Sequence, residues 1–281
     1  MKKILITGAN SYIGTSFERY VKDGFPEMYE IDTIDMIDGS WREKDFSVYD
    51  VIFHVAGIAH QKETKENARL YYEVNCELAT DTAKKAKDEG VGHFILLSSM
   101  SVYGMESGVI TKDTVPAPKS HYGKSKLGAE NNILELEDDS FSVAVVRPPM
   151  VYGKDCKGNF QTVIKIVKKL PVFPKVKNRR SMIHIDTLCE YIREYIDSGA
   201  SGIFLAQNYE YMNTSEMAKV ISEKLGKKIY LSSVLGLAVK LMCPFVSQAS
   251  KAFGTLVYEK DVEAKARKNE KTNRESVLES V

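Results

Sequence analysis

The sequence has little cysteine, and none of it is spaced for metal binding or redox chemistry. The four cysteines, Cys76, Cys156, Cys189 and Cys243, are scattered, and no two of them form a CxxC pair. A disulfide framework or a structural zinc site needs paired, more closely spaced cysteines. Their absence favours reduced thiols in a cytoplasmic protein, and no residue is predicted to bind a metal.

The sequence also lacks an excess of charge of one sign and a long apolar run. Its 39 basic and 38 acidic residues give a net charge of +1, so general attraction to nucleic acid is not expected. The longest apolar window, residues 234–246, is interrupted by Lys240 and Pro244 and is too short to cross a bilayer. No integral membrane segment is predicted. We expect this window to form a helix of a smaller domain, with a membrane-surface helix as the alternative.

Short apolar runs alternate with longer helical patterns in the first half of the chain. The runs KILITGA, YEIDTIDM, DVIFHVAG, HFILLSS and FSVAVVRPP are nearly continuous in apolar residues, as is typical of strands buried on both faces. They predict a doubly wound parallel α/β sheet of the Rossmann type. We expect a dinucleotide-binding domain at residues 1–153, which exchanges a strand and a helix with the later part. A smaller C-terminal α/β substrate-binding domain with a charged tail would occupy residues 154–281.

The second half of the chain has a looser pattern. NFQTVIKIVKKL predicts a helix, RRSMIHIDTLCEYIREYIDSG a short strand and then a helix, and GIFLAQ a further strand. The helix in TSEMAKVISEKLGKKI is expected to have Thr214 or Ser215 as its N-cap and to end at Gly226. The tail from Glu259 is densely charged, which predicts a frayed helix or partial disorder.

The stretch ILITGANSYIG, residues 4–14, leads an apolar strand into a glycine turn. Gly8 would let backbone N–H groups approach a pyrophosphate, and Gly14 would let the next helix pack closely on the strand. Ser11 stands where such a loop usually has its middle glycine, so we expect an intact but slightly altered loop. The predicted cofactor contacts of this loop are Gly8, Asn10, Ser11, Tyr12, Ile13 and Gly14.

The second predicted strand ends in IDTIDM, which offers an acidic side chain to an adenosine ribose. A carboxylate at that position accepts hydrogen bonds from the ribose hydroxyls and repels a 2′-phosphate. Asp35 is the first choice, and Asp32 is the alternative register. NAD is therefore favoured as cofactor, with NADP as the alternative because Arg42 lies close in the sequence.

The segment HYGKSK places Tyr122 and Lys126 four residues apart, on one face of a helix. A phenol has an ordinary pKa of about 10 and is a poor base at neutral pH. A neighbouring ammonium group favours the phenolate form. The spacing therefore predicts a tyrosine that exchanges a proton with substrate and a lysine that assists it.

Six segments, TGANSYIG, HVAG, SSMSVYG, YGKSK, RPPMVYG and NRRSMIHID, occur in the order and spacing of one family. From Met1 to about Gly226 the chain resembles the extended short-chain dehydrogenase/reductases, in particular the NAD-dependent nucleotide-sugar epimerase/dehydratase group that acts on UDP-hexoses. The resemblance implies a catalytic set of Ser99, Tyr122 and Lys126. It also implies that Ala56, Gly57, Tyr122 and Lys126 contact the cofactor, Lys126 at the nicotinamide ribose.

The same resemblance implies how a UDP-sugar would be bound. Ser99 would hydrogen-bond the reacting sugar hydroxyl, Asn159 would contact the diphosphate, and Arg180 would pair with that diphosphate. Met100 and Ser101 stand where the 4,6-dehydratases have an Asp–Glu pair, so dehydration is disfavoured. Asn75 would support the site, and a homodimer is implied by analogy.

Three functions are compatible with these residues. The first is a 4-epimerase of the UDP-glucose/UDP-galactose type, or of its N-acetyl form, which oxidises C4 transiently. The second is an NAD(P)H-dependent 4-reductase of UDP-4-keto-6-deoxy-hexoses in polysaccharide biosynthesis. The third is a non-catalytic NAD(P)-binding regulator on the same fold, which the complete Ser–Tyr–Lys set disfavours.

Overall fold

A computed structural model of the protein describes residues 1–59, 63–64, 66–243, 245–260 and 270–281. The chain divides into two compact units, neither of which is one continuous segment. Unit 1 comprises Met1–Gly104, Pro116–Pro148 and Leu188–Ala206, and unit 2 comprises Met105–Val115, Pro149–Thr187 and Gln207–Val281. The functional division at residue 153 into a cofactor domain and a substrate domain stays a prediction.

Unit 1 is built on a six-stranded parallel sheet in the order β10, β6, β4, β3, β1, β2. Its strands are β1 (Lys2–Thr7), β2 (Tyr29–Ile34), β3 (Val51–His54), β4 (His93–Leu97), β6 (Ser142–Val146) and β10 (Gly202–Phe204). The predicted doubly wound parallel α/β fold is confirmed. Every apolar run predicted as a strand contributes one, and GIFLAQ supplies the edge strand β10.

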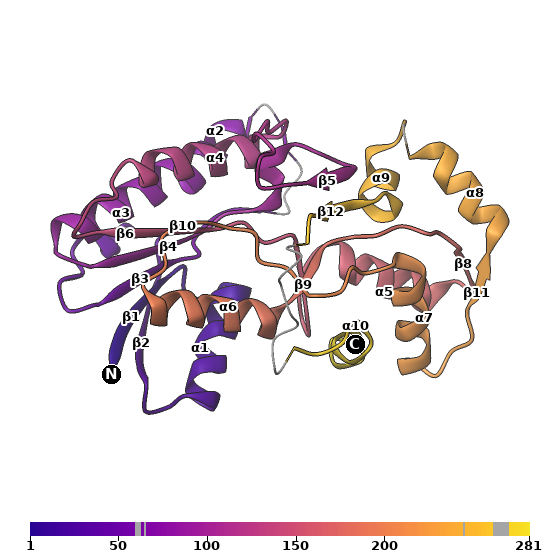
Figure 1. The fold of residues 1–281 in the computed structure, drawn as a ribbon, viewed down its shortest axis with the longest axis horizontal. Helices are drawn as coiled ribbons and strands as arrows, with labels where there is room; N and C mark the ends of the chain where they lie inside the picture. The colour runs from indigo at the N-terminus through magenta and orange to yellow at the C-terminus, as the bar shows by residue number, and fades with distance from the viewer. Residues whose placement is uncertain (60–62, 65, 244, 261–269) are drawn as a thin grey trace. The chain divides into compact units, whose positions relative to one another are not determined.

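Helices cover both faces of this sheet, which explains why its strands are continuously apolar rather than alternating (Figure 1). One face carries α2 (Ala68–Tyr72), the π-helical turn η2 (Glu73–Glu77), α3 (Leu78–Asp88) and α4 (His121–Leu134). The other carries α1 (Tyr12–Gly24) and α6 (Ile185–Ser198). Two short 3-10 turns, η1 (Ser40–Arg42) and η3 (Met100–Tyr103), follow β2 and β4.

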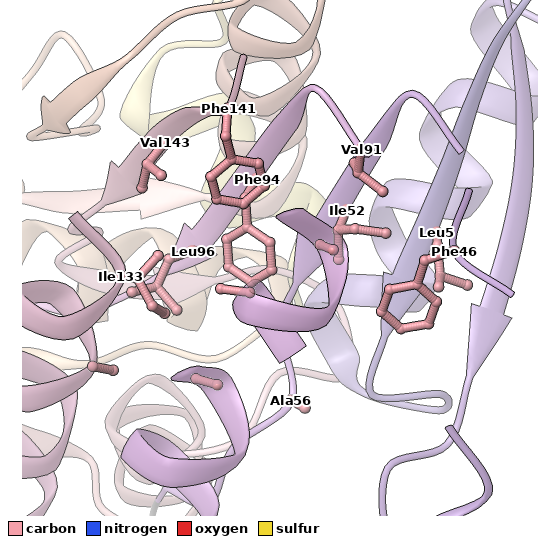
Figure 2. Packing of buried hydrophobic residues seen from close by; sticks show 14 of the residues in the cluster. Leu5, Phe46, Ile52, Ala56, Val91, Phe94, Leu96, Ile133, Phe141 and Val143 are labelled. Carbon is pink, nitrogen blue, oxygen red and sulfur yellow. The ribbon is translucent and has the colours of Figure 1, made fainter. Parts of the chain in front are cut away.

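The core of unit 1 lies between the sheet and the helices α3 and α4. Figure 2 shows Phe94 of β4 beside Phe141, and their ring centroids are 6.2 Å apart. Small side chains, the alanines at positions 79, 83 and 86, face this core from α3 and are fully buried. Because they are small, α3 can approach the strands closely, and the aromatic rings fill the remaining space.

The strand order reverses between β1 and β3. The chain runs outward from β1 to β2 and then, in the other direction, from β3 through β4 and β6 to β10. In open α/β sheets, ligands bind outside the carboxyl ends of the strands at such a reversal. Gly8 follows β1, Ala56 follows β3 and Ser99 follows β4, so the fold brings predicted cofactor and catalytic residues to one edge.

Unit 2 contains three short parallel strand pairs and five helices among its described residues. The pairs are β5 (Gly108–Ile110) with β12 (Leu256–Tyr258), β7 (Met150–Tyr152) with β9 (Met182–His184), and β8 (Val172–Pro174) with β11 (Tyr230–Ser232). The helices are α5 (Asn159–Lys169), α7 (Thr214–Lys224), α8 (Ser233–Met242), α9 (Ser247–Phe253) and α10 (Asn273–Glu279). Among the described residues, no helix combines the length and the apolar character needed to cross a membrane.

Two predictions for unit 2 are corrected by the structure. The N-cap of α7 is Asn213, not Thr214 or Ser215, because the Asn213 carboxamide accepts hydrogen bonds from two backbone N–H groups of the first turn, at 2.9 and 3.1 Å. The described end of the charged tail is not frayed, since α10 begins with a capping box between Thr272 and Glu275. Residues 261–269 of the tail lie outside the described residues.

Candidate active site

The turn after β1 is shaped by two glycines that no other residue could replace without displacing a neighbour. Gly8 has a φ of +94°, and a Cβ added there would lie 2.9 Å from the backbone of Ala56. A Cβ on Gly14 would lie 2.6 Å from the Ser11 hydroxyl oxygen. The turn is also tied to β2, since Gly8 N–H donates to the Ile34 carbonyl at 2.9 Å. Both glycines are therefore required for the loop to pack against Ala56 and Ser11.

Ser11 fits this loop without strain, which explains the departure from glycine. Its backbone is extended, with φ −70° and ψ 145°, and its hydroxyl caps α1 by accepting from Gly14 N–H at 3.2 Å. The left-handed conformation falls one residue earlier, on Asn10, with a φ of 64°. Asparagine tolerates that conformation better than most residues. Tyr12 and Ile13 are the first two residues of α1.

The structure distinguishes the two aspartates near the end of β2. Asp32 lies within β2, accepts a 2.5 Å hydrogen bond from the Tyr49 phenol and has Lys44 at 3.8 Å. Asp35 follows β2 directly, beside the Gly8 turn, and is exposed with its carboxylate bonded to the Ile37 N–H at 2.8 Å. Asp35 thus lies beside the Gly8 turn, whereas Asp32 is bonded to Tyr49, and the role of Asp35 at a ribose stays a prediction. Arg42 instead stacks on the Trp41 ring, 4.6 Å from its centroid.

Ser99 and Tyr122 meet at the carboxyl end of β4. Ser99 lies at the start of η3, where its hydroxyl accepts from Ser101 N–H at 3.1 Å, and Tyr122 is in the first turn of α4. Burial raises the pKa of the Tyr122 phenol, and a hydrogen bond with Ser99 lowers it in part. Ser99 therefore favours the ionised form of the phenol.

Lys126 is buried one helical turn after Tyr122. Its ammonium donates to the Leu97 carbonyl at 2.9 Å, at the end of β4. A Cβ on Gly57 would lie 3.3 Å from that ammonium, so the predicted residues Gly57 and Lys126 are neighbours. Burial lowers the pKa of Lys126 to about 8, and the carboxylate of Glu130 opposes that shift.

The expected lowering of the Tyr122 pKa by Lys126 stays a prediction. The shift of the Tyr122 pKa has three causes, which are burial, Ser99 and the phenol of Tyr71. Both side chains nevertheless leave α4 on the same face, four residues apart.

Asn75 connects the loop after β3 to the catalytic helix. Its carboxamide accepts from Ile58 N–H at 2.8 Å and donates to the Ile58 carbonyl at 3.1 Å and to the Ser125 hydroxyl at 3.2 Å. It lies in the π-helical turn η2, and a Cβ on Gly57 would approach its carboxamide oxygen at 2.8 Å. Asn75 thus holds Gly57 close to α4.

A buried ion pair that the sequence interpretation missed lies behind the catalytic residues. Arg147 donates to both carboxylate oxygens of Glu130, at 3.1, 3.1 and 2.5 Å, and to the Tyr103 phenol at 2.8 Å. Glu130 also accepts from the Ser98 hydroxyl and is fully buried. One signal was available: Glu130 follows Lys126 by four residues, so Tyr122, Lys126 and Glu130 share a helix face.

Glu63 is a second residue that the sequence interpretation missed. Its carboxylate accepts from His121 N–H at 2.8 Å and from Tyr122 N–H at 3.1 Å. An acidic group is favourable at this positive end of a helix. Glu63 therefore helps to fix the start of α4, where Tyr122, the predicted catalytic residue, lies.

The two predicted diphosphate ligands, Asn159 and Arg180, belong to unit 2. Arg180 is largely buried, and two of its bonds run from Nη1 to the carbonyls of Ser250 and Gly254, at 3.4 and 3.1 Å. Among the described residues, its buried Nε has no hydrogen-bond partner. Burial lowers the pKa of Arg180. Asn159 is exposed at the first position of α5, whose N-cap, Gly158, offers no side chain.

His184, Asp186 and Glu279 form a cluster in unit 2 with potential ligand atoms within 4.8 Å of one another. The ammonium of Lys271 lies among them, 3.0 Å from Asp186 and bonded to Glu279. A lysine thus already neutralises these carboxylates, as in an ordinary ion-pair cluster.

The matching family model is that of the NAD dependent epimerase/dehydratase family, and it covers residues 4–204. The chain belongs to this family. It is therefore an NAD(P)-dependent enzyme of sugar nucleotides, with NAD as its cofactor, as predicted.

The chain is 31% identical to a UDP-glucose 4-epimerase of Vibrio cholerae, over 93% of this chain and 84% of that protein. It is 23% identical to the N-acetyl-alpha-D-glucosaminyl-diphospho-ditrans,octacis-undecaprenol 4-epimerase of Escherichia coli O157:H7, over 80% of this chain and 73% of that protein. A solved structure of the UDP-glucuronic acid 4-epimerase from Bacillus cereus in complex with NAD has a similar fold. Its TM-score is 0.74 at 19% identity, covering 99% of this chain and 94% of that one.

Replacing Glu130 with alanine should destabilise the protein by about 3–5 kcal/mol, because it leaves the buried Arg147 charge without a partner. Urea unfolding of the two proteins measures the difference. The double variant Glu130→Leu/Arg147→Met is the control and should recover most of the loss, since it removes both charges. A single variant as stable as the wild type would contradict a buried ion pair.

The pKa of Lys126 predicts how stability depends on pH. The folded state releases this proton near pH 8 and the unfolded state near 10.5. The unfolded state therefore binds more protons in this window, and the stability contribution of Lys126 rises with pH. Between pH 7 and 10.5 the free energy of unfolding of the wild type should therefore rise by about 3 kcal/mol relative to that of Lys126→Met, which has no ammonium to titrate. Lys124→Met, at an exposed position of α4, is the control, and parallel curves for Lys126→Met would refute the buried ammonium.

Proposed function

We propose that this protein is a nucleotide-sugar 4-epimerase of the UDP-glucose/UDP-galactose type, or of its N-acetyl form, acting by transient oxidation at C4. The observation that carries the proposal is the placement of Ser99, just after β4, with Tyr122 in the first turn of α4 and the buried Lys126 one turn further along that helix. The similarity to the Vibrio cholerae 4-epimerase supports it.

Tyr122 would take the proton of the C4 hydroxyl and later return it, while Ser99 would hold that hydroxyl. Burial raises the pKa of the phenol, so the base needs compensating groups. Ser99 supplies one as a hydrogen-bond donor, and the positive charge of Lys126 would supply another. Bound NAD would provide the hydride acceptor and donor. The residues that would hold it are Gly8, Asn10, Ser11, Tyr12, Ile13, Gly14, Asp35, Ala56, Gly57, Tyr122 and Lys126.

Arg180 and Asn159 would bind the diphosphate of the substrate. A buried guanidinium whose Nε has no partner among the described residues is costly unless an anion pairs with it. A diphosphate offers the oxygens for such charge-assisted bonds. The exposed Asn159, in the first turn of α5, would add a carboxamide donor at the positive end of that helix.

A second candidate is an NAD(P)H-dependent 4-reductase of UDP-4-keto-6-deoxy-hexoses in polysaccharide biosynthesis. The same residues would serve it, because reducing a C4 ketone needs Tyr122 as proton donor in place of proton acceptor. Met100 and Ser101, the first residues of η3, carry no acid–base pair, and so dehydration stays disfavoured for both candidates. A cytoplasmic location and a homodimer are part of the proposal.

Tyr122→Phe should reduce turnover by about 10²–10⁴-fold, because the proton acceptor is lost, while most of the NAD affinity is kept by the other residues that would hold the cofactor. The assay follows interconversion of UDP-glucose and UDP-galactose, and of their N-acetyl forms, without added cofactor. NAD(P)H consumption with a 4-keto sugar nucleotide would identify the reductase instead. Tyr72→Phe, a partly exposed tyrosine of α2, is the matched control and should keep full activity. Unchanged turnover in Tyr122→Phe would refute the catalytic assignment.

Asp35→Asn should weaken NAD binding about tenfold and narrow the preference for NAD over NADP, because a carboxylate bonded to the ribose is lost. Calorimetric titration with both cofactors measures the two affinities. Asp32→Asn is the matched control. Since Asp32 is bonded to Tyr49, its variant should leave the affinity ratio unchanged. The opposite pattern would assign the ribose to Asp32.

A further inference from the structure

Helix α8 has its apolar side chains on the surface of unit 2. Val234, Leu237, Leu241 and Phe245 are 79%, 61%, 65% and 86% exposed. Their spacing of three or four residues places the first three on one face of α8, and Phe245 follows three residues beyond its end. Contiguous apolar surface of this kind on a monomer marks an interaction site.

Helix α8 is anchored to the rest of unit 2 at Gly236, its one buried residue. Gly236 is buried against the backbone of Lys175, where an added Cβ would lie 2.0 Å from the carbonyl oxygen. Ser232, the N-cap of α8, accepts the Lys175 N–H at 2.9 Å through its carbonyl. These contacts join α8 to the end of β8, near which it is drawn in Figure 1.

The segments that pack beside α8 are rich in lysine, and one of these lysines, Lys251 of α9, lies 3.9 Å from the carboxylate of Glu106. Residues 156–185 contain eight basic residues and no acidic one, and residues 224–258 contain five lysines and no acidic one. Pairing of β8 with β11 brings these two segments together, and Lys227 donates to the carbonyl of Lys168. Lys168, Lys169, Lys227, Lys228 and Lys240 are exposed, and none of them has a carboxylate partner in the described part of the chain.

We propose that α8 docks this protein on the surface of an anionic lipid bilayer. The apolar stripe from Val234 to Phe245 would enter the boundary between headgroups and acyl chains. The neighbouring lysines would contact the lipid phosphates, and Lys240 would extend its ammonium from the helix to the headgroups. No residue of the proposed catalytic or cofactor site takes part, so this docking is independent of the proposed function.

A second copy of the chain is a poorer occupant of the same face. A two-fold interface through α8 places the same patch of each subunit against the other. The unpaired lysines of one copy would then face those of the second, whereas an anionic bilayer supplies opposite charge. Charge complementarity therefore favours the bilayer.

Flotation of the full chain with lipid vesicles tests the docking. Vesicles of phosphatidylcholine with about a third phosphatidylglycerol should bind the protein, and pure phosphatidylcholine or high salt should release it. Leu237→Asp/Leu241→Asp should reduce binding more than about tenfold by removing apolar contact. Lys227→Glu/Lys228→Glu should reduce it about thirtyfold or more, because each lysine near the surface contributes about fivefold.

Two controls keep the test specific. Val115→Asp makes the same kind of change at another exposed apolar position, 79% exposed, and should bind vesicles like the wild type. Phe245→Trp should shift its fluorescence to shorter wavelength on anionic vesicles. Equal flotation of all variants, or no flotation of the wild type, would overturn the proposal. A wild-type dimer that Leu237→Asp/Leu241→Asp converts to monomer would overturn it too, by assigning the face to self-association.

Discussion

One buried carboxylate fixes the geometry on which the site depends. Glu130 accepts hydrogen bonds from Arg147, just after β6, and from Ser98, just after β4, while its own backbone belongs to α4. Two strand ends and the catalytic helix therefore share a single set of charge-assisted bonds. Ser99 follows Ser98 directly, so the bonds that hold Glu130 also set where Ser99 meets Tyr122. A buried charge is costly unless it is paired, so loss of either Glu130 or Arg147 should destabilise the whole arrangement.

Along α4 the same face changes from partly exposed to fully buried. Tyr122 at the start contacts Ser99, Lys126 one turn later donates to Leu97, and Glu130 one turn further is paired with Arg147. Burial favours the neutral form of both Tyr122 and Lys126. It raises the pKa of the phenol and lowers that of the ammonium to about 8. A bound dinucleotide and a sugar hydroxyl would enter an environment where small changes in charge decide which group holds the proton.

Unit 2 contains two features that cost free energy unless something binds to them. Arg180 is a largely buried guanidinium with an Nε that has no partner among the described residues. Helix α8 exposes leucine side chains to water, and Phe245 just beyond its end does the same, next to lysines that have no carboxylate partner among the described residues. A diphosphate would satisfy the first, and an anionic bilayer would satisfy the second. Both suggest that the stability of unit 2 is coupled to ligands, since anything that binds only the folded state stabilises it.

The sequence alone determined what depends on periodicity and local spacing. Continuous apolar runs predicted the buried parallel strands, the Gly8–Gly14 turn predicted the loop after β1, and the four-residue interval placed Tyr122 and Lys126 on one face of α4. Only the tertiary structure bonded Asp32 to Tyr49, paired Glu130 with Arg147, and left the apolar side chains of α8 exposed. Each of these depends on partners distant in the sequence, such as Tyr49 for Asp32 and Lys175 for Gly236. The spacing of residues along the chain does not show which distant side chains meet, because the packing of helices and strands against one another decides that.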